Sequence, residues 1–276
     1  MASPEVMTLA ASQIFERAAA GAIAATAIVL VAHRVRSLST SGAVAAIGIG
    51  AAATAAGWNW GALLVVYFVA ALLLSRLGRA EKARLTGGVV AKSGARDATQ
   101  VIANGGVFAA CLLGVLLGSK HSGVTSGIAA LGALAASAAD TWATEIGTLY
   151  GGTPRFLLTF RRIPAGTSGG VSTAGSLAMI AGSAFIALVA RYIGLPDAVG
   201  IVAAAGVAGA VADSLLGATL QERRWCSSCE KASERRVHDC GTPTTLAGGR
   251  EWMDNDVVNL LATFTGASVA ALLANV

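Results

Sequence analysis

Acidic residues occur within long apolar stretches of this 276-residue sequence, where a charged side chain is costly. Asp140 and Asp213 each follow a run of Gly, Ala and other apolar residues. An Asp at the centre of a membrane helix costs about 2.5–3.5 kcal/mol, whereas one Leu or Ile returns only about 0.3–0.6 kcal/mol. Because this cost has no evident folding benefit, we interpret the acids as functional. Two carboxylates from parallel helices are suited to Mg²⁺, which binds carboxylates together with water and phosphate oxygens.

Further acidic residues are expected at the same depth as this pair. Glu145 follows Asp140 near the end of one predicted helix, and Asp256 opens the last one. We predict Asp140, Asp213 and Glu145 as catalytic residues, and Asp140, Asp213 and Asp256 as ligands of Mg²⁺. For any one of them, a structural hydrogen bond to a Ser or Asn of a neighbouring helix is the alternative. The set favours function, because structural bonds would scatter through the bundle.

A glycine-rich loop precedes the apolar stretch that starts near residue 171. Bare backbone N–H groups and the positive end of a helix bind anions, and arginine adds charge-assisted hydrogen bonds to phosphate. No Walker lysine is present, so this is not an ordinary P-loop. The alternative is a flexible turn in which Ser172 is the N-cap. The residues that we predict to bind nucleotide phosphates are Arg161, Arg162, Gly166, Thr167, Ser168, Gly169, Gly170 and Ser172.

A stripe of polar residues enters the apolar stretch at 98–118. Asp97, Gln100 and Asn104 have the spacing i, i+3 and i+7, so they share one helix face. Asn255 and Asn259 share a face in the same way at the start of the last helix. The residues that we predict to hold the phosphate of a lipid substrate are Lys92, Arg96, Gln100, Asn104, Asn255 and Asn259.

Three of the four cysteines lie close together in the segment 221–255. Cys226, Cys229, His238 and Cys240 form the pattern C-x2-C-x8-H-x-C, which supplies four zinc ligands of accepted types. We expect the loop to be cytoplasmic, where a disulfide is disfavoured. The prediction is a closed, structural Zn²⁺ site, with unpaired thiols as the alternative. Cys111 lies in an apolar stretch and is expected to be a small core residue.

The composition places these residues in a membrane protein. Hydrophobic residues make up 55% of the chain and charged residues 13%, and the mean hydropathy is +0.67. Disordered chains and ordinary soluble enzymes have more charge, about 25% in a typical soluble domain. The 34 glycines suit closely packed membrane helices. The net charge of +5 is explained by membrane topology and does not indicate a nucleic-acid partner.

The gaps between charges predict an all-α, polytopic integral membrane bundle that forms a single domain over residues 1–276. The stretch 37–75 has no charge and is too long for one span, so it must turn at the Gly57–Gly61 segment. A signal-peptide pattern is not evident, so we expect residue 1 to belong to the mature chain. The predicted spans are about 12–32, 39–56, 61–76, 98–118, 123–147, 171–192, 197–220 and 256–275.

The basic residues predict how the bundle is oriented. With eight spans and the N-terminus outside, 17 of the 20 Lys and Arg residues fall on the inner side. We therefore expect an integral protein of a prokaryotic cytoplasmic membrane, with both termini outside. The alternative has seven spans, with the first apolar stretch lying at the membrane interface. All the predicted site residues belong to the inner side in either case.

These segments resemble a membrane family known as domain of unknown function 92. That family includes the plant and cyanobacterial phytyl-phosphate kinases and an uncharacterised animal transmembrane protein. The matching segments occur in the family order, and the cysteine segment is not part of the resemblance. They are QVIANG (100–105), DTWATEIG (140–147), PAGTSGGVS (164–172), ADSLLGA (212–218) and DNDVVN (254–259).

The resemblance implies a multi-pass helical protein that transfers a phosphoryl group from a nucleoside triphosphate, with CTP expected, to a prenyl monophosphate such as phytyl or geranylgeranyl phosphate. Phosphoryl transfer needs positioning and charge neutralisation more than covalent catalysis, which fits acids, glycines and arginines without a nucleophile. The alternative is an ion-coupled transporter of a lipid phosphate or small solute, because such proteins also contain intramembrane acids and glycine-rich breaks.

Overall fold

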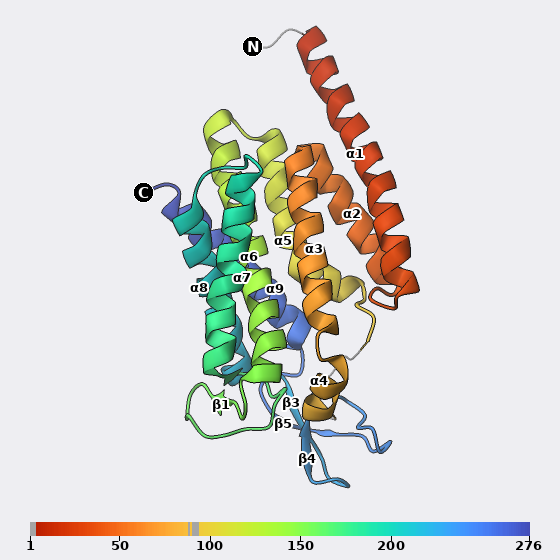
Figure 1. Ribbon diagram of the computed structural model, residues 1–276, viewed down its shortest axis with the longest axis vertical. Coiled ribbons are helices and arrows are strands. Elements are labelled where there is room, and N and C mark those ends of the chain that lie inside the picture. The colour runs from red at the N-terminus through yellow and green to blue at the C-terminus, as the bar shows by residue number, and fades with distance from the viewer. Residues whose placement is uncertain (1–3, 88, 90–93) are drawn as a thin grey trace.

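The computed structural model describes residues 4–87, 89 and 94–276 of the protein. Long helices run side by side, and short strands gather at one end (Figure 1). The helices are α1 (Pro4–Arg34), α2 (Thr40–Ala56), α3 (Trp58–Arg76), α4 (Arg79–Thr86), α5 (Ala98–Leu117), α6 (Lys120–Tyr150), α7 (Thr173–Tyr192), α8 (Val199–Thr219) and α9 (Asn255–Leu273). The strands are β1 (Arg155–Phe156), β2 (Gly170–Val171), β3 (Arg223–Cys226), β4 (Lys231–Ser233) and β5 (Thr245–Gly248).

The predicted spans correspond to eight apolar helices, α1–α3 and α5–α9. Seven of them are long and apolar enough to cross a membrane within the described residues. The eighth is α2, whose 17 residues rise about 25 Å, slightly less than the roughly 30 Å apolar core of a bilayer. The helix that falls short of the length criterion is thus α2 and not the first one, because α1 contributes a 24-residue apolar stretch, Ala11–Arg34.

Local sequence signals explain where the helices begin and end. The turn predicted between the second and third spans is confirmed at Gly57, whose φ of +151° suits only glycine and whose amide still bonds to Ala53 and Thr54. Oxygen-bearing side chains accept hydrogen bonds from the first free amides of most of the other helices. These N-caps are Ser39 for α2, Asp97 for α5, Ser119 for α6, Ser172 for α7 and Asp254 for α9.

Helix α6 is the centre of the bundle and packs against α5, α7, α8 and α9. Its middle section is apolar on every side, and the residues from Ala129 to Ala139 are all buried. A helix that is hydrophobic all round must be surrounded by other elements. This central position places the end of α6, with Asp140 and Glu145, between its neighbours rather than against lipid.

Small residues allow these helices to approach unusually closely. A Cβ atom on Gly132 of α6 would stand 2.4 Å from the carbonyl oxygen of Gly266 on α9, and one on Gly209 of α8 would stand 2.4 Å from Ala136 Cβ. Membrane helices lack a strong hydrophobic force between them, so close backbone packing supplies much of their attraction. The glycines therefore determine how near α8 and α9 lie to α6.

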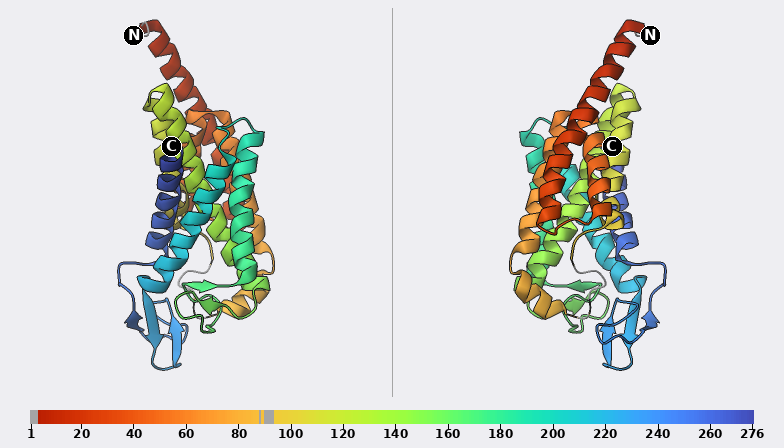
Figure 2. Two further views of the ribbon diagram at one scale, coloured as in Figure 1. Left: turned by 90° about the vertical axis from the view of Figure 1, so that its left-hand side faces the viewer. Right: turned by 90° about the vertical axis from the view of Figure 1, so that its right-hand side faces the viewer.

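The loops add short strands, which the all-α prediction did not include. Strands β1 and β2 form an antiparallel pair with Phe156 opposite Gly170, and β4–β3–β5 form a small antiparallel sheet. The sheet occupies the segment between α8 and α9 that was predicted as a Cys/His loop. All five strands lie at the same end of the bundle, opposite the two termini (Figures 1 and 2). We call this the polar end.

The glycine contact between α6 and α9 leads to a stability prediction. We expect Gly132→Ala to lower the free energy of unfolding by about 1–3 kcal/mol, because the added methyl group meets backbone that cannot move aside. Gly48→Ala in α2 is the matched control, since its Cβ would meet no atom within 4 Å. Thermal unfolding in detergent measures the difference, and an equal effect of both substitutions would contradict the packing argument.

Candidate functional site

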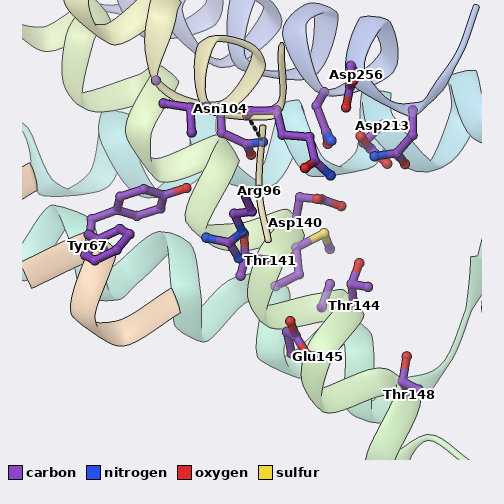
Figure 3. Close-up of a pocket in the computed structure, with 18 of the residues that line it drawn as sticks. Tyr67, Arg96, Asn104, Asp140, Thr141, Thr144, Glu145, Thr148, Asp213 and Asp256 are labelled. Carbon is purple, nitrogen blue, oxygen red and sulfur yellow. Dashed lines mark hydrogen bonds between the residues drawn. The ribbon is translucent and has the colours of Figure 1, made fainter. Parts of the chain in front are cut away.

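A cavity of about 1310 Å³ opens at the polar end and continues between the helices. Its wall contains residues of α5, α6, α8 and α9, the loop before α7 and the segment that follows β4. Polar side chains predicted from separate parts of the sequence meet here (Figure 3). The cavity is larger than the 300–1,000 Å³ of a typical small-molecule site, so it has room for two ligands or for one with a long tail.

Asp140 of α6 and Asp213 of α8 are direct neighbours in this cavity. Their carboxyl groups lie within hydrogen-bonding reach of each other, and the charges of Glu145 and Glu234 also act on the pair. Asp213 Oδ2 is buried and has no hydrogen-bond donor among the described residues. Two acids in contact repel each other when both are ionised, so the pair requires a proton or a cation between them.

Asp256 faces the same space from the first turn of α9 (Figure 3). Its Oδ2 accepts a hydrogen bond of 2.9 Å from the hydroxyl of Thr99 on α5. Thr99 Oγ1 also lies 2.7 Å from Oδ1 of Asp97, the N-cap of α5, so the single hydroxyl hydrogen is shared between the two carboxylates. The start of α5 thus orients Asp256 towards the carboxyl pair, and three acids from three helices surround one space.

Glu145 has a different environment from the other acids. Its Oε2 forms an ion pair with Lys82 Nζ of α4, and Lys82 also donates to the carbonyl oxygens of Leu74 and Ser75 at the end of α3. The ammonium group is therefore fully engaged with α3 and α6. We assign Glu145 to holding α4 against the bundle, at the edge of the cavity rather than at the carboxyl pair (Figure 3).

The glycine-rich loop docks directly on the acid-bearing face of α8. Gly217 lies one turn after Asp213, and a Cβ atom on Gly217 would stand 2.9 Å from the amide nitrogen of Gly169. A Cβ atom on Gly169, whose φ is +76°, would stand 2.5 Å from Ala218 Cα. Only glycine permits this approach. The loop residues Gly166–Ser172 all line the cavity, and the buried Thr167 Oγ1 has no partner among the described residues.

The structure does not bring Arg161 and Arg162 into the cavity. Both are exposed in the β1–β2 hairpin, because the strand pairing turns this part of the loop outward. The arginines that line the cavity are Arg96, Arg235 and Arg236. Arg96 belonged to the predicted substrate residues, whereas Arg235 and Arg236 were missed because they belong to the Cys/His segment, which showed no sequence link to the acids.

Backbone contacts explain how Arg96 is held. Its amide donates to Ser37, and its carbonyl accepts from the amide of Ser39, both over 3.0 Å. A Cβ atom on Gly42 of α2 would stand 2.1 Å from that carbonyl oxygen, so the backbone at Arg96, just before α5, lies directly against α2. The predicted partner Lys92 lies outside the described residues.

The amide residues of the predicted substrate site are partly used for structure. Gln100 completes a capping box with Asp97. Asn104 donates to the carbonyl of Gln100 and accepts a 2.7 Å hydrogen bond from Ser137, which in turn contacts the hydroxyl of Tyr67. Both residues nevertheless line the cavity, as do Asn255 and Asn259 at the start of α9.

The cavity continues from the polar groups into an apolar arm between α1, α2 and α3. The arm extends from Leu38 to Thr54, and α2 rises about 21 Å between Thr40 and Thr54. Thr54 fits between glycines of α1 and α3, since a Cβ on Gly21 or Gly61 would overlap its side chain. Representative residues of the arm are Ala25, Ile28, Ala46, Ile49, Leu64 and Phe68.

The four predicted zinc ligands come together at the polar end. Their ligand atoms, from Cys226, Cys229, His238 and Cys240, lie within 4.8 Å of one another. Hydrogen bonding with Thr242 lowers the pKa of Cys240 to about 6, whereas hydrogen bonding with Cys240 raises the pKa of Cys229 to about 11. The two thiols therefore interact directly with each other, as ligands of one site would.

Fold and site together define a polytopic membrane protein with an acid-lined cavity at one end of its helices. The family described as integral membrane protein DUF92 matches residues 23–267. The chain therefore belongs to this family, as its sequence motifs predicted. No solved structure matches the chain.

Two relatives are similar to this chain over most of their length, and a third over about one third of its length. Protein PGR of Arabidopsis thaliana is 30% identical over 265 residues, which cover 87% of this chain and 90% of the relative. An uncharacterised membrane protein of Synechocystis is 27% identical over 78% of this chain and 74% of its own. The chloroplastic protein VTE6 of Arabidopsis thaliana is 31% identical over 137 residues, which cover 49% of this chain and 34% of VTE6.

The ion pair between α4 and α6 can be tested by a double-mutant cycle. We expect Lys82→Met and Glu145→Gln each to lower the free energy of unfolding, and the double variant to lose less than their sum by about 1–3 kcal/mol. The reason is that each single variant leaves a half-buried polar group without its partner. Additive losses in denaturation measurements in detergent would contradict this pairing.

Proposed function

We propose that the protein transfers a phosphoryl group from a nucleoside triphosphate to a prenyl monophosphate at the polar end of the bundle. The observation that carries the proposal is the meeting of three elements in one cavity: the Asp140–Asp213 pair, the glycine-rich loop and the apolar arm. The resemblance of the family to phytyl-phosphate kinases supports the reaction type. CTP is the nucleotide that this resemblance favours.

The carboxyl pair fits Mg²⁺ on its own chemistry. Asp140 and Asp213 supply hard oxygen ligands, Asp213 Oδ2 is buried without a donor, and Asp256 adds a third carboxylate nearby. A divalent cation would relieve the repulsion between the acids. When bound, Mg²⁺ would neutralise charge on the transferring phosphoryl group. Glu145, engaged with Lys82, is not needed as a ligand in this proposal.

The remaining residues of the cavity bind and orient the two phosphorylated ligands. The amides and hydroxyls of Gly166–Ser172 would cradle the nucleotide phosphates, as backbone nests do for other anions. Arg96 would hold the lipid phosphate, and Asn255 and Asn259, which line the same cavity, would add hydrogen bonds to it. An oxygen of the lipid phosphate forms a bond to the γ-phosphorus while the bond from that phosphorus to the nucleoside diphosphate breaks. Because the acceptor is already anionic, no general base is required.

The apolar arm gives this proposal its lipid specificity. It begins beside the polar groups and continues between the apolar helices α1, α2 and α3. A prenyl phosphate matches this arrangement, with its charged head at the polar end and its tail among apolar side chains. Burial of the tail would contribute about 25 cal/mol per Å² of apolar surface removed from water.

The proposal is tested by incubating the purified protein in detergent with geranylgeranyl or phytyl phosphate, Mg²⁺ and labelled CTP, ATP, GTP or UTP. We expect a prenyl diphosphate product, and a fall in kcat of about 10²-fold or more for Asp140→Asn and Asp213→Asn. These variants remove charge that orients the transferring group while preserving side-chain size.

Asp197→Asn is the matched control, because Asp197 is exposed at the opposite end of the bundle and pairs only loosely with Arg191 at 3.7 Å. It should retain full activity. If folded protein yields no diphosphate with any pair of substrates, the proposed reaction is wrong, and nucleotide-independent uptake of a phosphorylated solute in proteoliposomes would instead identify a carrier.

The apolar arm predicts a dependence on tail length. Ala46→Phe on α2 adds bulk to the wall of the arm, so kcat/KM for geranylgeranyl phosphate should fall about tenfold or more relative to geranyl phosphate. Val44→Phe is the control on the same helix, since Val44 is exposed on the outer face and does not line the cavity. Equal losses for both substrates would place the tail elsewhere.

A further inference from the structure

We propose that Cys226, Cys229, His238 and Cys240 bind one structural Zn²⁺ ion, which holds the β3–β5 sheet in the shape that completes the cavity wall. We call the segment from β3 to β5 the knuckle. The zinc site stands independently of the proposed function, whereas its effect on the cavity rests on that function.

The geometry of the cluster matches a tetrahedral metal site. Zn–S bonds of about 2.3 Å and Zn–N bonds of about 2.0 Å place sulfur atoms about 3.8 Å apart and sulfur about 3.5 Å from nitrogen in a tetrahedron. Cys226 Sγ lies 3.6 Å from Cys240 Sγ, and His238 Nδ1 lies 3.2 Å from Cys240 Sγ. A disulfide would require the sulfur atoms to be about 2.05 Å apart, and all the cysteines are free.

Two turns present these ligands to each other. The turn between β3 and β4 carries Cys226 and Cys229, and Cys226 is completely buried. The second turn is closed by two hydrogen bonds, from the His238 amide to Thr242 and from the Gly241 amide to His238, and Gly241 has a φ of +83°. A hydrogen bond from the hydroxyl of Thr242 to Ser228 joins the turns. Four protein ligands leave no open position, which is typical of structural zinc.

The knuckle is held by a buried ion pair between Arg224 and Glu222 and by hydrogen bonds of Thr244, but it has little apolar core. Its three strands have three or four residues each, and a sheet of this size buries too little apolar surface to be stable by itself. The large apolar side chains of Trp225, Val237 and Leu246 are exposed. A metal that crosslinks the two turns supplies the missing free energy, as it does in other zinc-stabilised modules.

The knuckle contacts the glycine-rich loop and its neighbours through Glu234, which follows β4, and Arg223, the first residue of β3. Glu234 accepts hydrogen bonds from Ser168 in the loop and from Gln221 at the end of α8. The guanidinium group of Arg223 lies over the ring of Phe156 in β1, 5.5 Å from its centroid. Arg235 and Arg236 follow Glu234 and line the cavity. The order of the knuckle therefore determines where these charges lie.

Metal analysis of the protein purified in detergent, without chelators, tests the site. We expect about one zinc ion per chain, lost in Cys229→Ser and retained in Cys111→Ala, the cysteine of α5 that lies outside the cluster. Replacement of zinc by Co²⁺ should give the absorption bands of tetrahedral, thiolate-bound cobalt. Two results would overturn the proposal. One is that the protein contains no zinc although the cells were grown in zinc-containing medium, and the other is that a Cys226→Ser/Cys229→Ser variant retains its zinc.

If the cysteine variants fail to fold, the unmodified protein still decides the question. A zinc-selective chelator should expose the three knuckle thiols to a thiol reagent while circular dichroism shows the helices unchanged. The mass of the denatured protein, measured without a reducing agent, is the second readout. A mass that shows a disulfide in place of these thiols would overturn the proposed zinc site.

The role in the cavity is measured with the same chelator in excess Mg²⁺. The KM for the nucleotide should rise about tenfold, corresponding to the loss of one charge-assisted hydrogen bond, with kcat largely kept because the acids belong to the helices. An unchanged KM after zinc removal would reject the positioning role while leaving the zinc site intact. If the protein does not catalyse the kinase reaction, the measured zinc content still tests the zinc site by itself.

Discussion

The contact between two acidic side chains inside a membrane bundle is the constraint on which the polar end depends. Asp140 and Asp213 come from different helices, and the two carboxyl groups cannot both be ionised there without a cation between them. Their meeting requires that α6 and α8 run in the same direction and approach closely at one depth. The loop before α7, the start of α9 and the knuckle are all arranged around this pair.

The close approach of these helices depends on residues with very small side chains. Glycine and alanine remove the bulk between α6, α8 and α9, so their backbones come within van der Waals contact. The same device recurs where the glycine-rich loop meets α8, at Gly169 and Gly217. Small residues thus allow both the close packing of the helices and the close approach of the glycine-rich loop to α8.

The cavity has two parts. The part at the polar end of the bundle, where the helices end, is lined by charged and polar groups, whereas the apolar arm is lined by apolar side chains of α1, α2 and α3. An amphipathic ligand satisfies both parts at once. Helix α1, which packs mainly against α2, accordingly lines the apolar arm and contributes none of the acidic residues of the cavity.

The sequence alone was sufficient for the eight apolar helices but not for α4, because charge-free stretches, glycine turns and N-caps are local signals. Acids within apolar stretches and a glycine-rich loop also predicted that Asp140, Asp213, Asp256 and the loop would lie together, and all of them line one cavity. The sequence was not sufficient for partners that come from distant segments. The Lys82–Glu145 ion pair, the outward position of Arg161 and the inward position of Arg235 depend on how loops fold over the helix ends. Periodicity and spacing describe one element at a time, whereas the packing of several elements decides which side chains face each other.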